Sequence, residues 1–195
     1  MSREILLVTG VSGSGKDYLL DKTKRHDARI GTTIPVVSMG SAIVAKMRQQ
    51  ELGSGVGRDG LKHVVSNDTM RAVVQSIVAE LVEYPAAIVN GHITYRQQGQ
   101  LTSNPDIDAE INPSAYVVVV AEPRDIHAWR AADLSRAREP ETVDQIAYHQ
   151  DFTIQTAERA AATLGAGIRI IENTPEITKA SSLVIATMID DICPK

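Results

Sequence analysis

The sequence predicts an α/β fold in which helices cover both faces of a mainly parallel β-sheet. Short apolar runs alternate with stretches of helical periodicity along the 195 residues, the order expected of repeated strand–helix units. The run AYVVVVA at 115–121 is apolar without interruption, as expected of a strand buried on both faces. A glycine-rich stretch, GVSGSGKD at 10–17, directly follows the first apolar run and indicates a turn from strand to helix.

Short apolar runs predict strands at 4–8, 34–38, 86–90, 115–121 and 167–171. Apolar residues recurring every three or four positions predict helices at about 15–26, 39–52, 67–83, 124–137, 141–164 and 175–191. Thr174 and Pro175 are the expected N-cap and first residue of the last helix. The irregular segment 91–114 is predicted to be a loop crossing the carboxyl edge of the sheet, where such folds bind ligands.

Composition narrows the class of protein. The length predicts a single domain spanning 1–195. The net charge of −4 argues against a nucleic-acid partner, because a phosphate backbone selects basic surfaces. Cys193 is the single cysteine and cannot build a disulfide framework, which favours a reducing, cytoplasmic setting. No apolar run approaches the roughly 18 residues of a membrane span, so we expect no membrane partner.

The stretch from Gly10 to Lys16 fits the phosphate-binding pattern G-x-x-x-x-G-K, and it lies between a predicted strand and a predicted helix. Glycines let successive backbone N–H groups point inward, and the helix N-terminus adds partial positive charge. A glycine-rich turn without a ligand is the alternative, which this position disfavours. The expected ATP-binding residues here are Gly10, Val11, Ser12, Gly13, Ser14, Gly15, Lys16, Asp17 and Tyr18.

Asp17 stands where this pattern usually has Ser or Thr, whose hydroxyl binds Mg²⁺. A carboxylate beside a triphosphate repels it unless a cation lies between them. Asp17 therefore either faces Mg²⁺ or caps the helix away from the phosphates, and the sequence leaves both readings open. The predicted cofactor is Mg²⁺ bound with ATP, and Asp17 is its candidate protein group.

Several segments form a pattern more specific than the phosphate loop alone. They are VTGVSGSGK at 8–16, VSMGSAIVAKMRQQ at 37–50, GRDGLKHV at 57–64, AAIVNGHIT at 86–94, NPSAYVVVVAEP at 112–123, WRAADLSRAREPETVDQIAYHQ at 129–150 and GAGIRIIEN at 165–173. Together they resemble the archaeal-type adenylate kinases, P-loop kinases of nucleoside monophosphates, over almost the full chain.

The resemblance implies a three-layer P-loop NTPase fold whose five-stranded parallel sheet has the order 2-3-1-4-5. It implies transfer of the ATP γ-phosphate to AMP or a related (deoxy)nucleoside monophosphate. It also implies an acceptor-binding insertion at about 39–84 and a short lid at about 130–142. Members of the family often form trimers, so we expect a homo-oligomer, either a trimer or a dimer.

Site residues follow from the matching segments. The resemblance implies catalytic roles for Lys16, Arg130, Arg136 and Arg138. It implies acceptor binding by Ser38, Gly40, Ser41, Arg58 and His92, and an adenine-side position for Asn173. His149 and Gln150 are expected to orient helices, and Trp129 is expected to pack on the lid helix and not on a base.

Departures from the family pattern leave the acceptor open. The family's Asp at the end of the third strand is Asn90 here, and we hypothesise that Asp17 takes over its anionic role. Ile154 replaces a family Arg, for which Arg159 is a candidate substitute one helical turn on. The changed segment GQLTSNPDIDAE at 99–110 lies near the acceptor pocket. Alternatives are another small-molecule kinase, similar in its loop to gluconate kinases, or a nucleotide-binding regulatory protein with weak turnover.

Overall fold

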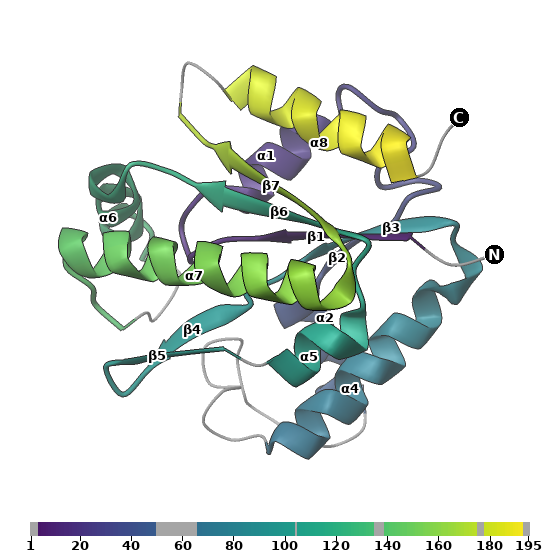
Figure 1. The fold of residues 1–195 in the computed structure, drawn as a ribbon, viewed down its shortest axis with the longest axis horizontal. Helices are drawn as coiled ribbons and strands as arrows, with labels where there is room; N and C mark the ends of the chain where they lie inside the picture. Colours follow the sequence, from purple (N-terminus) through teal and green to yellow (C-terminus); the bar gives the residue numbers. More distant parts are fainter. Residues whose placement is uncertain (1–3, 50–65, 104, 135–138, 175–177, 193–195) are drawn as a thin grey trace.

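The computed structural model describes residues 4–49, 66–103, 105–134, 139–174 and 178–192. Its centre is a five-stranded parallel sheet in the order β2-β3-β1-β6-β7 (Figure 1). The strands are β1 Glu4–Thr9, β2 Val36–Ser38, β3 Ala86–Asn90, β6 Ala115–Val120 and β7 Gly167–Glu172. The strands β4 and β5 form a separate hairpin. When the five strands of the main sheet are numbered 1 to 5 along the chain, their spatial order is 2-3-1-4-5, which confirms the predicted order.

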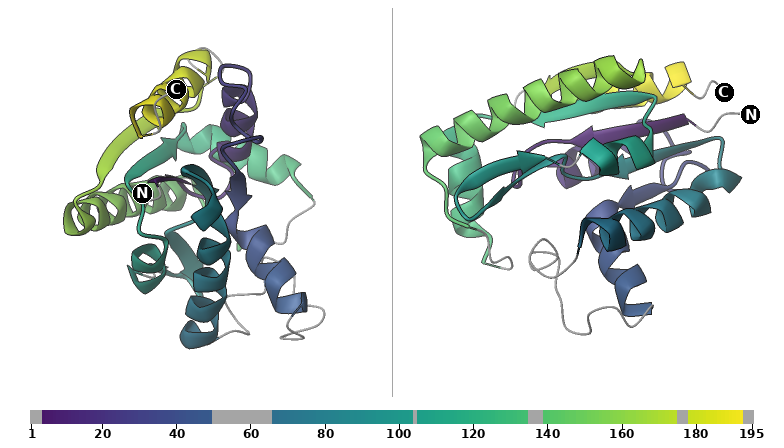
Figure 2. Two further views of the ribbon diagram at one scale, coloured as in Figure 1. Left: turned by 90° about the vertical axis from the view of Figure 1, so that its right-hand side faces the viewer. Right: turned by 60° about the horizontal axis from the view of Figure 1, so that its bottom comes forward.

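Helices lie on both faces of the sheet. They are α1 Lys16–Thr23, α2 Met39–Gln49, α4 Asn67–Glu80, α5 Pro105–Ile111, α6 Pro123–Ala132, α7 Val143–Leu164 and α8 Thr178–Ile192. Alternate residues of β1 separate the two sides: Leu6 and Val8 pack with α1 and α8, whereas Ile5 and Leu7 pack with α2, α4 and α7. Figure 2 shows α2 and α4 side by side, at the opposite end of the molecule from α8.

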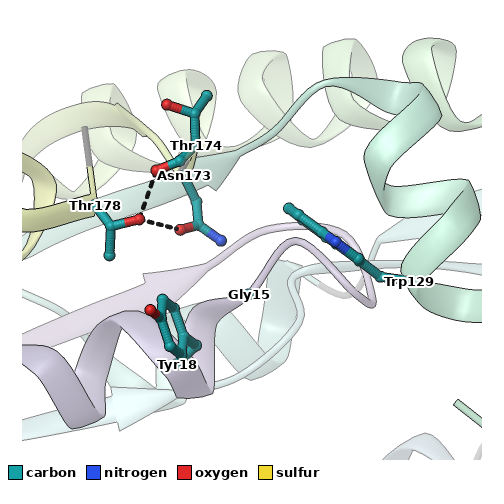
Figure 3. Close-up of a pocket in the computed structure, with 6 residues that line it drawn as sticks. All are labelled: Gly15, Tyr18, Trp129, Asn173, Thr174 and Thr178. Atoms are coloured by element: carbon teal, nitrogen blue, oxygen red, sulfur yellow. Dashed lines mark hydrogen bonds between the residues drawn. The ribbon is translucent and has the colours of Figure 1, made fainter. Parts of the chain in front are cut away.

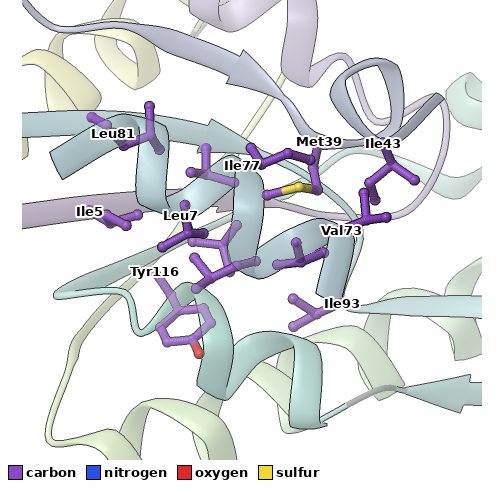
Figure 4. Packing of buried hydrophobic residues seen from close by; sticks show 14 of the residues in the cluster. Ile5, Leu7, Met39, Ile43, Val73, Ile77, Leu81, Ile93 and Tyr116 are labelled. Carbon is purple, nitrogen blue, oxygen red and sulfur yellow. The ribbon is translucent and has the colours of Figure 1, made fainter. Parts of the chain in front are cut away.

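The larger core cluster lies on the α2 and α4 side. Side chains of the two helices meet those of the sheet there, among them Met39, Ile43, Val73, Ile77, Ile5, Leu7 and Tyr116 (Figure 4). Tyr116 is fully buried, so its ring contributes to the core although its hydroxyl is polar. The unbroken apolar run of β6 is explained by this packing, because both faces of the strand are covered.

Local sequence signals set several helix ends. Ser66 caps α4 by accepting a 3.2 Å hydrogen bond from Thr69 N. Thr142 and Gln145 form a reciprocal capping box at the start of α7. Gly165 ends α7 in the left-handed region, at φ 68°, where a residue without Cβ is favoured. Pro123 occupies the first turn of α6, where its missing N–H costs nothing.

The prediction of a loop at 91–114 is wrong. This segment contains the antiparallel strands β4 Thr94–Gln97 and β5 Gln100–Ser103, followed by α5. Gln98 and Gly99 turn the hairpin with φ of 52° and 78°, and such two-residue turns match the twist of paired strands. The segment is polar, so apolar periodicity did not reveal it, although its Gln98–Gly99 pair is a turn signal.

Some boundaries also differ. The first and third helices of the prediction end earlier than expected, at Thr23 and Glu80, with a 3₁₀ turn at Leu81–Glu83 after the latter. The helix α2 is described as far as Gln49, and its expected continuation to 52 lies outside the described residues. The helix expected to reach 137 ends at Ala132. Pro175, the expected start of α8, lies outside the described residues, and α8 is described from Thr178. Within the described ranges, no helix combines the length and the apolar character needed to cross a membrane.

Candidate active site

The phosphate loop connects β1 to α1 at the carboxyl edge of the sheet. Gly10 has φ 146°, and a Cβ there would lie 2.3 Å from the carbonyl oxygen of Val119 in β6. Gly15 has φ 85°, and a Cβ there would lie 2.0 Å from Asn173 Nδ2. Both glycines are therefore required by backbone conformation and by the close approach of neighbouring groups.

Lys16 is 6% exposed, and its ammonium group lies against the inside of this loop. Lys16 Nζ donates to the carbonyl oxygens of Gly10, at 2.9 Å, and Val11, at 3.0 Å. The positive charge is thus held where the loop and the first turn of α1 meet. A phosphate bound by the loop would exchange these carbonyl contacts for stronger, charge-assisted ones.

His92 lies against the same loop. Its Nδ1 is 2.8 Å from Gly10 O and 3.4 Å from Lys16 Nζ. A carbonyl oxygen can only accept, so Nδ1 carries the proton, and the contact with Lys16 joins two donors. His92 was expected to bind the acceptor, and its ring contacts the phosphate loop.

Asp17 faces the end of β3. Asn90 Nδ2 donates to Asp17 Oδ1 at 2.5 Å, which joins two of the positions at which the sequence departs from the usual pattern. Asn90 is 7% exposed, whereas Asp17 is exposed. Asn90 pairs in register with Val8 of β1 and Ser38 of β2, so the carboxyl ends of three strands meet here.

Arg130 lies across the loop from α6. Its Nε donates to Ser12 O at 2.7 Å, and its Cγ is 3.0 Å from the point where a Cβ of Gly13 would lie. Its Nη1 donates to Glu141 Oε2 at 2.6 Å. Nη2 is buried and has no hydrogen-bond partner among the described residues. The guanidinium therefore has a donor left for an anion at the loop.

Glu141 is a buried carboxylate with three cationic or polar donors. In addition to Arg130, it accepts from Arg96 Nε at 3.0 Å and from His149 Nδ1 at 3.1 Å, both through Oε1. Burial raises the pKa of Glu141, but the hydrogen bonds from His149 and Arg130 outweigh it and lower that pKa to about 2. Glu141 therefore remains charged and holds the arginines in place.

The hairpin is attached to this cluster. Arg96 of β4 donates from Nη1 to Gly99 O at 2.6 Å, and Gly99 N donates to Glu139 Oε1 at 2.8 Å. Thr94 of the same strand is 3.3 Å from His149 Nε2 through its hydroxyl. The polar hairpin and the residues that precede α7 therefore form one hydrogen-bonded unit.

Gln150, next to His149, binds the end of β6. Its Oε1 accepts from Ala121 N at 3.0 Å, and its Nε2 donates to Ala121 O at 2.9 Å. Both ends of the amide are thus used on one backbone position. The geometry agrees with the expectation that His149 and Gln150 orient helices.

A cavity of about 320 Å³ opens beside the loop (Figure 3). It is lined by Gly15, Tyr18, Trp129, Asn173, Thr174 and Thr178. Trp129 was expected to pack on the lid helix, and its ring forms a wall of this cavity. Tyr18 forms another wall, and Lys22 Nζ lies 4.9 Å from the centre of its ring.

The polar side chains of the cavity bind one another. Asn173 Nδ2 donates to Ser14 O at 3.0 Å, and Thr178 Oγ1 lies 3.4 Å from Asn173 Oδ1. Thr178 Oγ1 also donates to Thr174 O at 2.5 Å. Asn173 thus supports the phosphate loop from the cavity side, which the sequence pattern could not reveal.

The other predicted residues divide into two groups. Ser38 ends β2, and Gly40 and Ser41 lie in the first turn of α2, with the Ser38 and Ser41 hydroxyls 3.4 Å apart. Arg58, Arg136 and Arg138 lie outside the described residues.

Arg159, the candidate substitute for the missing family arginine, makes local contacts. It hydrogen-bonds within its own helix, to Gln155 O at 3.2 Å and Thr156 Oγ1 at 3.5 Å, and Ile154 packs against the core. Arg96 and Glu141 were missed by the sequence analysis. Arg96 lies in the segment that was predicted to be a loop. Glu141 directly precedes the capping Thr142 and resembles an ordinary acidic residue at a helix start.

Comparisons with known proteins agree with this geometry. A family model described as an AAA domain matches residues 9–147. The adenylate kinase of Thermoplasma volcanium is 32% identical over 171 residues, which cover 86% of this chain and 89% of the relative. The chain belongs to the archaeal-type adenylate kinase family. A second member, the adenylate kinase of Thermoplasma acidophilum, is 29% identical over 171 residues, 86% of this chain and 88% of its own.

Solved structures show the same fold at low identity. Shikimate kinase from Acinetobacter baumannii, in complex with shikimate, aligns with a TM-score of 0.59 at 11% identity, covering 100% of this chain and 97% of its own. Shikimate kinase from Bacteroides thetaiotaomicron aligns with a TM-score of 0.52 at 16% identity, covering 97% and 99%. These alignments establish a P-loop kinase fold, and membership of the adenylate kinase family makes the chain a phosphotransferase.

Proposed function

We propose that the chain is an ATP-dependent nucleoside monophosphate kinase that transfers the γ-phosphate of ATP to AMP or a related (deoxy)nucleoside monophosphate. The observation that carries this proposal is the position of Arg130, which lies across the phosphate loop with Nη2 still lacking a partner among the described residues. Phosphoryl transfer needs positive charge around the transferred group more than it needs covalent help from the protein. A loop that only binds nucleotide has less use for a second buried cation.

The residues would divide the work as follows. Lys16 and the loop amides bind the β- and γ-phosphates. Arg130, Arg136 and Arg138 neutralise the negative charge of the transferred phosphoryl group in the transition state. The cavity beside Asn173 takes the base of ATP. The acceptor is bound by Ser38, Gly40, Ser41, Arg58 and His92, of which Gly40, Ser41 and Arg58 belong to the insertion at about 39–84, and the segment at about 130–142 acts as a short lid. His92 also contacts the carbonyl oxygen of Gly10 in the phosphate loop.

The residues present fit Mg²⁺. Within the described ranges, no cluster of three or more His, Cys, Asp or Glu could hold a metal by itself. Mg²⁺ at nucleotide sites needs only one or two carboxylate ligands, the remainder being phosphate oxygens and water. The exposed carboxylate of Asp17, at the start of α1, meets that requirement. When bound with ATP, the ion would neutralise phosphate charge.

We further propose that the protein acts in the cytoplasm as a homodimer or homotrimer, with ATP, ADP and a nucleoside monophosphate as its partners and without nucleic acid or membrane.

The function is tested by mixing the protein with Mg-ATP and each common ribo- and deoxynucleoside monophosphate, and following acceptor-dependent ADP formation. We expect rapid turnover with one monophosphate and none with Lys16→Met, whose side chain lacks the charge. A panel of small hydroxylated acceptors, including gluconate and shikimate, tests the other kinase class. If ATP binds but no monophosphate is phosphorylated, the proposed acceptor class is wrong.

A further inference from the structure

Asp17 and Asn90 come from different parts of the chain, and their side chains meet. Asn90 Nδ2 donates to Asp17 Oδ1 at 2.5 Å, and no other hydrogen bond involves either side chain among the described residues. The amide is 7% exposed and the carboxylate is exposed. The buried amide of Asn90 therefore holds the exposed carboxylate of Asp17 by one oxygen. Among the described residues, Asp17 Oδ2 has no hydrogen-bond partner.

The direction of this contact decides between the two readings of Asp17. A carboxylate that capped α1 would accept from the amides of the first helical turn. Instead, Asp17 is the second residue of α1, and its side chain turns to the end of β3. It therefore faces the carboxyl end of β3, where Asn90 pairs in register with Val8 of β1 and Ser38 of β2.

The pair also has a favourable distribution of charge. A carboxylate at the buried position 90 would pay a larger desolvation cost than one at the exposed position 17. A neutral amide at 90 pays less and can still donate, which a carboxylate cannot. The chain thus has one negative charge at this corner of the loop, at the position more open to solvent.

We propose that Asn90 is a positioning residue for Asp17, and that the two side chains together serve as the group facing the magnesium of Mg-ATP. Asn90 fixes the carboxylate through Oδ1, and Oδ2 is the oxygen offered to the cation or to its bound water. The inference rests on the proposed function for the identity of the ligand. It adds that the carboxylate acts as one half of a coupled pair.

The experiment measures the affinity of the β,γ-imido analogue of ATP by calorimetry, once with Mg²⁺ and once with a chelator. The quantity of interest is the ratio of the two dissociation constants, which reports how far the cation assists binding without any acceptor or turnover. We expect Mg²⁺ to tighten binding to the natural protein, and Asp17→Ala, which leaves no ligating side chain, to reduce that assistance roughly 10- to 100-fold.

Two further variants test the pair. Asn90→Ala keeps the carboxylate but removes its support, so the assistance by Mg²⁺ should fall severalfold while chelator affinity stays the same. The double variant Asp17→Ala with Asn90→Asp moves the carboxylate to the other position, and it should regain assistance that Asp17→Ala alone has lost. Asp21→Asn is the matched control, since Asp21 is an exposed acid on the same helix that pairs with Lys24.

The outcomes are distinguishable. Unchanged assistance in Asn90→Ala would show that Asn90 only packs the strand end, and failure of the double variant to improve on Asp17→Ala would refute the coupled pair. An equal loss of affinity with and without Mg²⁺ indicates damage to the loop and also contradicts the inference. If the natural protein binds the analogue with no assistance by Mg²⁺, the inference fails alone. If it does not bind the analogue at all, the proposed function fails first.

Discussion

Arg130 Nη1 lies 2.6 Å from Glu141 Oε2, so an arginine that crosses the phosphate loop is held by a carboxylate from the far side of the proposed lid. The two side chains are 10% and 5% exposed. An ion pair this well buried is sensitive to the loss of either partner, because the other charge remains desolvated. Glu141 therefore acts through Arg130 and is a positioning residue.

We predict that Glu141→Gln lowers kcat by between about 10- and 100-fold, because a small displacement of a charged group at the transferred phosphoryl weakens catalysis strongly. The amide offers one acceptor oxygen and one donor group in place of two acceptors, so at least one of Arg96, Arg130 and His149 would face an N–H group. The KM for ATP should change less, since Lys16 and the loop are untouched. Steady-state kinetics separate the two constants.

Glu139→Gln provides the control. Glu139 accepts from Gly99 N and does not appear in the contacts of Arg130, so its kcat should stay within about twofold of the natural value. A purely structural role for Glu141 would instead appear as a lower melting temperature with an unchanged kcat.

Acid should weaken the same cluster. The pKa of Glu141 is lowered to about 2 from an ordinary 4.5, so the folded state favours the charged form. The stability it contributes is fully present above about pH 4.5 and is lost as the pH falls toward about 2. Melting curves of the natural protein and Glu141→Gln should therefore converge as the pH falls through this window. Curves that stay parallel would contradict the prediction.

Asp108 should make stability change with pH in the opposite direction, so that the protein loses stability as the pH rises. Asp108 is 4% exposed, its Oδ2 has no partner in the part of the chain that the structure describes, and burial raises its pKa to about 7. The folded state therefore holds this proton more tightly than the unfolded chain, and the contribution is lost as the pH rises from about 4 to about 7. Asp108→Asn, which is neutral and similar in size, should remove the slope and raise the melting temperature by a few degrees at about pH 8.

The matched control for this change is Asp151→Asn, because Asp151 is exposed on α7. It should leave the dependence of the melting temperature on pH as in the natural protein. Superimposable pH profiles for Asp108→Asn and the natural protein would show that Asp108 is not the group responsible.

The cavity predicts how the donor base is bound. Trp129 and Tyr18 provide aromatic walls, and stacking on a base is worth about 1–3 kcal/mol and tolerates any base. Asn173 and Thr178 are engaged with each other and with the backbone, so we expect little selection among bases. Trp129→Ala should raise the KM for ATP and GTP by similar factors.

Tyr148→Ala controls for the loss of an exposed ring, since Tyr148 is 64% exposed on α7 and does not line the cavity. A KM for ATP that rises in Trp129→Ala while that for GTP stays constant would show that the base edge is read, and stacking alone would then be the wrong account.

The sheet could be predicted because its signals are local. The apolar runs gave all five sheet strands to within two residues, and the glycines of the loop report close backbone contacts that no other residue permits. The hairpin was missed because its side chains are largely polar and are stabilised by hydrogen bonds to Glu139 and Glu141, about 40 residues away. Contacts of this kind leave no periodic signal in a single sequence.

The same contrast between local signals and tertiary contacts holds for the site. Lys16 and Arg130 belong to segments with recognisable patterns, and the structure brings both to the loop. Glu141 and Asn173 lie in such segments too, but the contacts through which they support Arg130 and the loop are tertiary and leave no pattern in the sequence. The sequence led to the hypothesis that Asp17 takes over the negative charge lost at Asn90. The hydrogen bond between the two side chains became visible only in the structure.

Gln150 has a consequence for how this chain could change in evolution. Its amide uses both ends on the backbone of Ala121, which fixes the rotation and the height of α7 against the sheet. Glu141, just before that helix, must meet Arg130 at the same time. One inserted residue between these two positions would turn one of them by about 100° relative to the other. Insertions and deletions should therefore be tolerated before Glu141 or well after Gln150, and excluded from the interval between them.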